Sequence, residues 1–87
     1  MGISAIFKVL SDPFRRNILM MLKEGKMSAG EISRKTTLTD ATVSYHLKRL
    51  RKADLIIETR CRNYIFYELN MSGLADVLDW TDGVRSI

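Results

Sequence analysis

Residues 27–52, MSAGEISRKTTLTDATVSYHLKRLRK, decide the fold of this chain. Ser28 can cap a first helix, and Glu31, three residues further on, completes a capping box. The hydroxyl side chains of segment 36–39 then offer the backbone local hydrogen bonds that compete with a helix. Thr39 can cap a second helix, which begins with the acidic Asp40. The sequence therefore predicts a short helix, a tight turn and a longer helix.

The longer helix, 40–52, has two different faces. Val43, Leu47 and Leu50 are spaced as a buried apolar stripe. The opposite face is small and polar at its start and basic at its end: Ala41, Ser44, Tyr45, Lys48 and Lys52. This arrangement is typical of a helix-turn-helix whose second helix reads the major groove of DNA.

A β-hairpin is predicted directly after this helix. Residues 55–60 and 64–69 are rich in β-branched and aromatic side chains, and a short polar segment, 61–63, separates them. We expect Asn63 to adopt the positive φ that the turn needs. Arg60 and Arg62 lie at the tip, as in the wing of a winged helix, where they could enter a minor groove or contact phosphates.

Three further helices complete the prediction. They cover residues 3–10, residues 14–23 with Pro13 at the first position and Ser11 or Asp12 as cap, and a last helix that begins at Asn70 or Ser72. Arg15 and Arg16 should face phosphate or carboxylates. The predicted class is mainly α with a β-hairpin (α+β), a winged helix-turn-helix with four helices, two strands and a fifth helix in one domain, 1–87.

The two terminal helices, 3–10 and 72–86, are expected to form a dimer interface. A chain of 87 residues buries only about 60–65% of its unfolded surface. Both helices nevertheless carry apolar stripes for which little core is left. The stripes consist of Ile3, Ile6, Phe7, Leu10, Leu74, Val77, Leu78 and Val84.

Charge is divided unevenly along the chain. The net charge is +4. Residues 1–62 hold thirteen Lys and Arg against six Asp and Glu, a balance of +7, whereas residues 63–87 have a balance of −3. An excess of positive charge around the helix-turn-helix indicates a nucleic-acid binder, although an ordinary basic surface is the alternative.

Cysteine and histidine are too few for most site chemistry. Cys61 and His46 are single and belong to different predicted elements, and Asp76 with Asp79 lacks a histidine, so no metal site or other cofactor is expected. An incidental surface thiol is the favoured interpretation of Cys61, and a redox switch is the alternative. Nothing assembles a catalytic mechanism. One cysteine, no signal peptide and no membrane-length apolar run predict a cytoplasmic protein.

Several short motifs occur in the order and spacing of a known family. They are Leu10-Ser11-Asp12-Pro13, Arg15-Arg16, Ile18-Leu19, Ala29-Gly30-Glu31-Ile32, Thr42-Val43-Ser44-Tyr45-His46-Leu47, Leu50, and Tyr64-Ile65-Phe66-Tyr67-Glu68-Leu69-Asn70. Over nearly its whole length the chain resembles the ArsR-type bacterial repressors, and within them the SdpR-like autorepressor branch, which lacks the metal sites of the founding members. The resemblance implies a homodimer that binds a palindromic operator in double-stranded DNA and represses transcription.

By the same resemblance, the recognition positions fall on Asp40, Ala41, Thr42, Ser44, Tyr45 and His46. Asp40 departs from the amide or basic residue of many relatives, because an acid repels phosphate and can only accept a hydrogen bond, for example from cytosine N4. His46 could reach a phosphate or form a buried hydrogen bond. Lys48, Arg49 and Lys52 are expected to contact phosphates, with a solvated basic face as the alternative.

The main alternative function is a winged helix that docks an acidic protein partner. Such a surface should present a large apolar patch, whereas the predicted recognition face presents Ser, Thr, Tyr and Lys. The sequence shows no effector site, which leaves open a regulatory partner protein.

Overall fold

The structure, a computed structural model, describes residues 2–85 and their side chains except at positions 80–82, 84 and 85. This part of the chain forms five helices and three strands. In order they are α1 (Ile3–Leu10), α2 (Pro13–Leu22), β1 (Met27–Ser28), α3 (Ala29–Arg34), α4 (Asp40–Lys52), β2 (Ile56–Cys61), β3 (Tyr64–Leu69) and α5 (Met71–Arg85). The predicted winged helix-turn-helix of the α+β class is confirmed.

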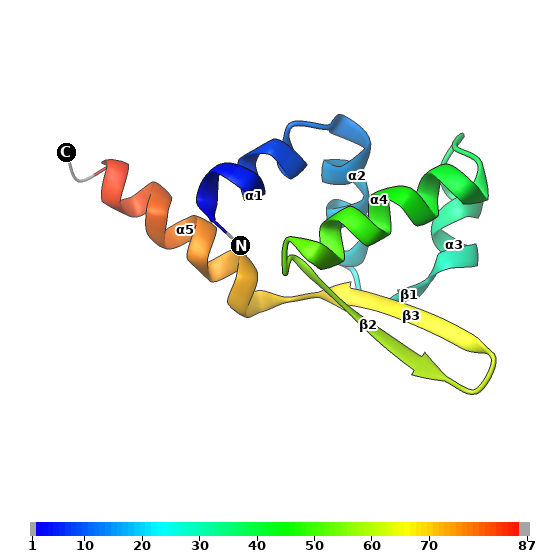
Figure 1. The fold of residues 1–87 in the computed structure, drawn as a ribbon. Helices are drawn as coiled ribbons and strands as arrows, with labels where there is room; N and C mark the ends of the chain where they lie inside the picture. The colour runs from blue at the N-terminus through cyan, green and yellow to red at the C-terminus, as the bar shows by residue number, and fades with distance from the viewer. Residues whose placement is uncertain (1, 86–87) are drawn as a thin grey trace.

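The elements are arranged around α4. In Figure 1 the helices α1 to α4 form one cluster, the β2–β3 hairpin extends from one side of it, and α5 projects at the other end. The molecule is therefore elongated, measuring 47 × 25 × 22 Å along its principal axes. No helix in the described residues is long and apolar enough to cross a membrane.

The sheet has one strand more than the sequence predicts. Its order is β1-β3-β2, with both pairings antiparallel. The hairpin register runs from Ile56 opposite Leu69 to Cys61 opposite Tyr64. Strand β1 pairs Met27 with Tyr67 and is only two residues long, too short for an alternating pattern to reveal it.

The tip of the hairpin differs from our expectation. The residue with positive φ is Arg62, at 56°, and not Asn63. A two-residue turn of this kind favours Asn or Gly at its left-handed positions, so composition alone pointed to the wrong residue of the pair.

The core lies where the predicted stripes meet. Its largest fully buried side chains are Ile18, Ile32, Val43, Leu47, Leu50 and Leu55. The stripe of α4 is thus entirely internal, which confirms its predicted orientation. Burying an aliphatic side chain of this size contributes about 1.5–3 kcal/mol, so the outward direction of the opposite face of α4 is fixed by packing.

The predicted helix caps are present. Asp12 accepts hydrogen bonds from the backbone N–H groups of Phe14 at 2.8 Å and Arg15 at 3.3 Å. Ser28 and Glu31 form the full capping box, and Thr39 accepts from the N–H of Thr42 at 3.2 Å. These side chains satisfy backbone donors that have no partner inside a helix.

The break between α3 and α4 is also made by a hydroxyl, as predicted. Thr36 Oγ1 donates to the carbonyl of Ser33 and accepts from the N–H of Leu38, both at 3.2 Å. The Ser33 carbonyl also accepts from the N–H of Thr36 at 3.2 Å, so one residue ends α3 and supplies a partner for the N–H of Leu38 in the turn.

Helix α5 begins in close contact with the connection between α4 and β2. Asp54 in this connection has a φ of 60°, and the N–H of Asn70 donates to the carbonyl of Leu55 at 3.0 Å. Gly73 is buried against Asp54, and a Cβ at this glycine would overlap the Asp54 carbonyl oxygen. Only glycine therefore fits at this position.

The residues predicted for the dimer interface whose side chains are described divide into three groups. Ile6 is 5% exposed and belongs to the core of the protomer, so its assignment to an interface was wrong. Ile3, Leu10, Leu74 and Val77 are half-buried against that core. Phe7 and Leu78 are exposed, and the side chain of Val84 lies outside the described residues.

Candidate nucleic-acid interface

The outer face of α4 collects most of the side chains predicted to contact DNA. Those exposed at the helical spacing of a single face are Ala41, Ser44, Tyr45, Lys48, Arg49 and Lys52. Small and polar side chains lie in the first half of the helix and basic ones in the second half. A face of this kind can enter a groove at one end and meet phosphates at the other.

The first turn of α4 is partly committed to its own cap. Thr42 is half-buried, and its hydroxyl lies 2.9 Å from the Thr39 hydroxyl. Asp40 is exposed in the first turn, where its charge suits the helix dipole. Thr42 is therefore less free to meet a base than Ser44 or Tyr45.

Tyr45 contacts two guanidinium groups. Its ring centroid lies 5.8 Å from Cζ of Arg15 on one side of the fold and 5.6 Å from Cζ of Arg49 on its own helix. The ring also meets the edge of His46, with centroids 5.7 Å apart. The side chain is 52% exposed, so it is oriented by its neighbours and still open to a ligand.

Of the two alternatives for His46, a phosphate contact or a buried hydrogen bond, the structure shows the buried hydrogen bond. It is 5% exposed, and its Nδ1 accepts a hydrogen bond from Nε of Arg15 at 3.2 Å. Phe14 stacks on the imidazole ring, with centroids 6.2 Å apart. A side chain with so little exposed surface is therefore a poor candidate for the predicted DNA contact.

Arg15 was expected to face phosphate or carboxylate, and this was wrong. The side chain is buried and donates to His46 and, through Nη1, to the carbonyl of Val9 at 3.2 Å. It therefore connects α1, α2 and α4 at one point. The adjacent Arg16 is exposed and donates to the carbonyl of Leu10 at 2.8 Å. No local pattern distinguishes these two arginines, because the partner His46 is 31 residues away.

The wing carries Arg60 and Arg62 as exposed side chains, as predicted. Its base is tied to α4 by an ion pair between Arg51 and Glu58, with Nη1 and Oε2 3.2 Å apart. Tyr67 of β3 donates its hydroxyl to the same carboxylate at 3.1 Å. Burial, together with this hydrogen bond and the charge of Glu58, raises the pKa of Tyr67. This group was not predicted from the sequence, because its members lie on three different elements.

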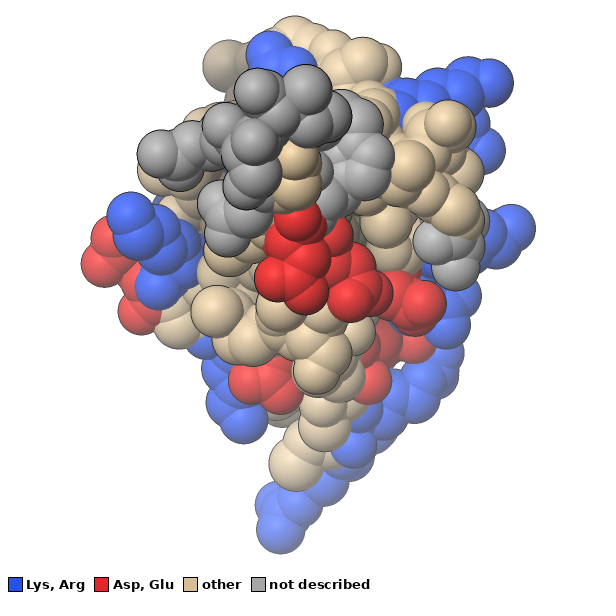
Figure 2. Space-filling view, turned by 90° about the vertical axis from the view of Figure 1, so that its left-hand side faces the viewer, with Lys and Arg blue, Asp and Glu red and all other residues tan. Residues whose placement is uncertain are grey.

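The charges of the fold are separated in space. Figure 2 views the molecule from the end at which α5 projects, and acidic side chains gather in the middle of this face while Lys and Arg lie around its edges. Asp76 and Asp79 on α5 are exposed. Basic side chains are exposed on α4 and on the wing, so a polyanion would be attracted to those elements and repelled from the acidic α5.

Metal-binding side chains do not come together in the part of the chain that the structure describes. No group of three or more His, Cys, Asp or Glu residues there could hold an ion. Cys61 is an exposed free thiol at the end of β2, and the side chain of His46 is used inside the core.

Comparison with known proteins agrees with this geometry. Residues 12–58 match the sequence model described as "Bacterial regulatory protein, arsR family". The chain is 40% identical over 75 residues to the transcriptional repressor SdpR of Bacillus subtilis (strain 168), and the match covers 86% of this chain and 83% of that protein.

Solved structures show the same fold. The crystal structure of the ArsR family transcriptional regulator RHA00566 superposes with a TM-score of 0.88 at 19% identity, covering 95% of this chain and 91% of the other. The solution structure of the homodimeric winged helix-turn-helix DNA-binding domain of Mb0332 from Mycobacterium bovis, a possible ArsR-family regulator, gives a TM-score of 0.79 at 21% identity, covering 97% and 78%. With a family match over more than half of its length and a relative at 40% identity, this chain belongs to the arsR family of bacterial regulatory proteins.

Proposed function

We propose that this protein is a cytoplasmic, non-enzymatic transcriptional repressor that binds double-stranded DNA as a homodimer. The observation that carries the proposal is the outer face of α4, where exposed small, polar and basic side chains lie beside a wing with two exposed arginines. The name of the Bacillus relative, a transcriptional repressor, supports it.

The proposed interface divides its work between affinity and sequence choice. Lys48, Arg49 and Lys52 would contact phosphates, which supply most of the binding energy but carry no sequence information. Ser44 and Tyr45 would reach base edges, and Ala41 could meet a thymine methyl group. Asp40 and Thr42 would act mainly at the start of the helix, since their positions serve the cap.

The wing would hold the DNA beside the groove that α4 enters. Arg60 and Arg62 are placed at the end of a hairpin whose base is fixed to α4 through Arg51 and Glu58. Arginine suits both phosphate contacts and insertion into a narrow minor groove.

A dimer through α1 and α5 would present two copies of α4 to a palindromic operator. Two-fold symmetry requires half-sites about 34–36 Å apart. The NMR neighbour, Mb0332, is described as homodimeric. Repression would follow from occupation of the promoter, with no metal as effector, and the protein could act on its own gene.

The proposal is tested by fluorescence anisotropy with the DNA upstream of the protein's own gene and a scrambled duplex of equal length. Both are titrated over a salt series. A preference of about 10³-fold or more with a steep loss of affinity in salt is expected of a site-specific repressor. Steep salt dependence without preference would contradict autoregulation. Weak binding to both duplexes with little salt dependence would contradict DNA binding and favour the docking of an acidic protein.

A further inference from the structure

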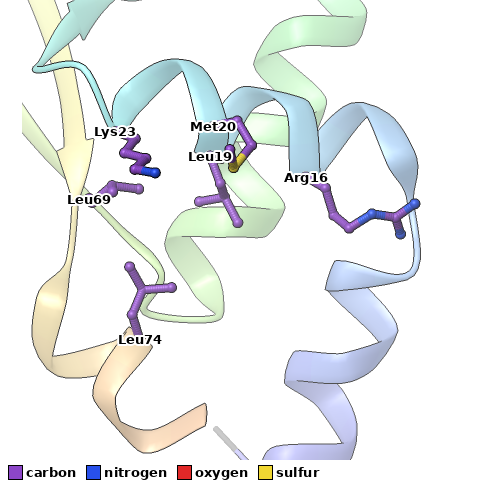
Figure 3. Close-up of a pocket in the computed structure, with 6 residues that line it drawn as sticks. All are labelled: Arg16, Leu19, Met20, Lys23, Leu69 and Leu74. Carbon is purple, nitrogen blue, oxygen red and sulfur yellow. The ribbon is translucent and has the colours of Figure 1, made fainter. Parts of the chain in front are cut away.

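A cavity of about 470 Å³ lies on the side of α2 away from the recognition face. Its walls come from α2, the end of β3 and the start of α5, and the residues are Arg16, Leu19, Met20, Lys23, Leu69 and Leu74 (Figure 3). Pockets that bind small molecules usually measure about 300–1,000 Å³, are mostly apolar and contain a few polar groups. This cavity matches that size, and its wall is almost entirely apolar.

The apolar side chains that line the cavity are partly exposed to water. Leu19, Leu69 and Leu74 are only half-buried against the core, and Met20 is 60% exposed. An apolar group placed between these side chains would be removed from water together with them, which is favourable in proportion to the area covered. The cavity therefore favours a ligand with an apolar body.

The two polar side chains at the edge of the cavity, Arg16 and Lys23, are both cationic and exposed. Figure 3 shows the Lys23 side chain extending alongside Leu69 at one end, whereas Arg16 points away from Leu19 and Leu74. Arg16 already donates to the carbonyl of Leu10. No Asp or Glu is among the lining residues, and Lys23 forms no ion pair with any residue in the described part of the chain. One lysine in an apolar setting matches a single negative charge.

We propose that this cavity binds a small amphipathic carboxylate, such as a medium-chain fatty acid. The apolar chain would lie against Leu19, Met20 and Leu74, and the carboxylate would meet the ammonium group of Lys23 beside Leu69. A doubly charged phosphate fits less well, because it calls for several donors and the cavity provides one available cation.

The site is connected to the elements proposed to bind DNA. Leu19 and Met20 belong to α2, whose Arg15 orients His46 and Tyr45. Leu69 ends the wing strand β3, and Leu74 is on α5, the proposed dimer helix. A ligand that shifts α2 against α5 would therefore change the presentation of α4. Linkage is reciprocal, so bound DNA would change the affinity for the carboxylate by the same factor.

Binding is tested by isothermal titration calorimetry with decanoate on the full chain. We expect saturable binding of one molecule per protomer. Octanoate should bind on the order of tenfold more weakly, because it buries two fewer methylene groups, and uncharged decanol should also bind more weakly. The absence of saturable decanoate binding, or equal binding of octanoate and decanoate, would overturn the proposal.

Two substitutions test whether decanoate binds in this cavity. Met20→Glu adds a carboxylate to the wall at an exposed position and should weaken decanoate binding at least tenfold. Lys23→Glu should reverse the preference, so that decyltrimethylammonium binds better than decanoate. A variant that had merely lost its fold would bind neither. Lys35→Glu makes the same charge change at an exposed residue outside the cavity and should leave decanoate binding unaltered. Binding by Met20→Glu equal to that of the original chain would refute the assignment.

A second copy of this chain is the competing occupant. Sedimentation velocity on the original chain and on Met20→Glu distinguishes the two. If Met20→Glu is monomeric at a concentration where the original chain is dimeric, and the original chain does not bind decanoate, the cavity is a dimer contact and the ligand proposal fails.

The regulatory step rests on the proposed function and is measured separately. Operator affinity should change at least fivefold in saturating decanoate for the original chain and should not change for Met20→Glu. Unaltered operator affinity in the presence of bound decanoate would refute regulation, whereas a lack of operator binding under all conditions would refute the proposed function and leave the calorimetric result standing.

Discussion

Tyr45 has the strongest claim among the exposed side chains of α4 to set sequence preference. Its ring is oriented by Arg15 and Arg49 and is still half exposed. Tyr45→Ala should reduce binding to the operator by about 1–3 kcal/mol and leave binding to random DNA nearly unchanged. Competition anisotropy measures both affinities. Lys52→Ala is the contrasting control, since loss of a phosphate contact should weaken both. An equal loss on random DNA would exclude a reading role for Tyr45.

Arg15 should matter for stability far more than the neighbouring Arg16. Arg15→Met leaves Nδ1 of buried His46 and the carbonyl of Val9 without their donor. An unsatisfied buried polar group costs about 1–3 kcal/mol, so the free energy of unfolding should fall by that amount in urea denaturation. Arg16→Met changes an exposed side chain and should stay within about 0.5 kcal/mol. Equal effects of the two substitutions would contradict the structural role of Arg15.

The limits of sequence reasoning are visible at single residues. Ser28 and Thr39 were predicted as caps, and Asp12 was one of two candidates, because each acts on backbone groups within three residues. The inward position of His46 was one of two open alternatives, and the burial of Arg15 was not anticipated. Each depends on the other, and their separation of 31 residues leaves no local signature.

At the scale of helices, two cap carboxylates should make stability depend on pH. Partial burial of Asp12 acts to raise its pKa, but hydrogen bonds from the N–H groups of Phe14 and Arg15, with the charges of His46 and Arg15, lower the pKa overall. For Glu31, hydrogen bonds with Ser28 lower the pKa. A lowered folded-state pKa means that the stabilisation is complete above the unfolded value near 4 and is lost as the pH falls through the folded value.

The expected outcome is a decrease in the urea midpoint below about pH 4. The double variant Asp12→Asn, Glu31→Gln should show a smaller decrease, because its amides do not titrate. Glu24→Gln, which removes an exposed carboxylate outside the caps, is the matched control. A double variant with the full acid sensitivity of the original chain would show that the caps do not carry the effect.

Two glycines of α5 should respond oppositely to the same substitution. Gly73→Ala places a Cβ against the carbonyl of Asp54, and relief of such overpacking typically costs about 1–3 kcal/mol. Gly83→Ala meets nothing within 4 Å and should stabilise the helix by about 0.5–1 kcal/mol. Thermal unfolding followed by circular dichroism compares them. Equal tolerance at both positions would mean that α5 does not dock against the α4–β2 connection.

Elements with a periodic apolar pattern were predicted well. Features that depend on contacts with distant segments of the chain were not predicted. The stripe Val43, Leu47, Leu50 fixed both the existence and the orientation of α4 because periodicity is a property of the chain itself. Strand β1 exists only because β3 lies beside Met27 and Ser28. The requirement for glycine at position 73 likewise comes from Asp54, a residue in another segment.

For the whole molecule, Leu78 provides a test of the proposed dimer. It is 63% exposed on α5, and a charge buried in an apolar interface is strongly unfavourable. Leu78→Asp should convert a dimer at micromolar concentration into a monomer and weaken operator binding, as measured by sedimentation velocity and anisotropy. Ser72→Asp introduces the same charge on another face of this helix and should leave the dimer intact. A monomer of the unsubstituted chain in sedimentation velocity at micromolar concentration would contradict the proposed dimer.

At the scale of the whole molecule, the distribution of charge over the elements was predicted well from the sequence. The balance of +7 in residues 1–62 and −3 in residues 63–87 became a basic helix and wing and an acidic α5. The cavity could not be foretold, since its walls come from segments as far apart as Arg16 and Leu74. Apolar side chains in each segment were expected only to fill the core or the dimer interface.

The short strand β1 also sets an order in time for folding. The β2–β3 hairpin closes through a turn of two residues, and formation of such a hairpin takes about 1–10 μs. Pairing of Met27 with Tyr67 must instead close a loop of about 40 residues, whose entropy has to be lost before the pairing contributes. We therefore expect β1, at the start of the helix-turn-helix, to pair with β3 of the wing late in folding.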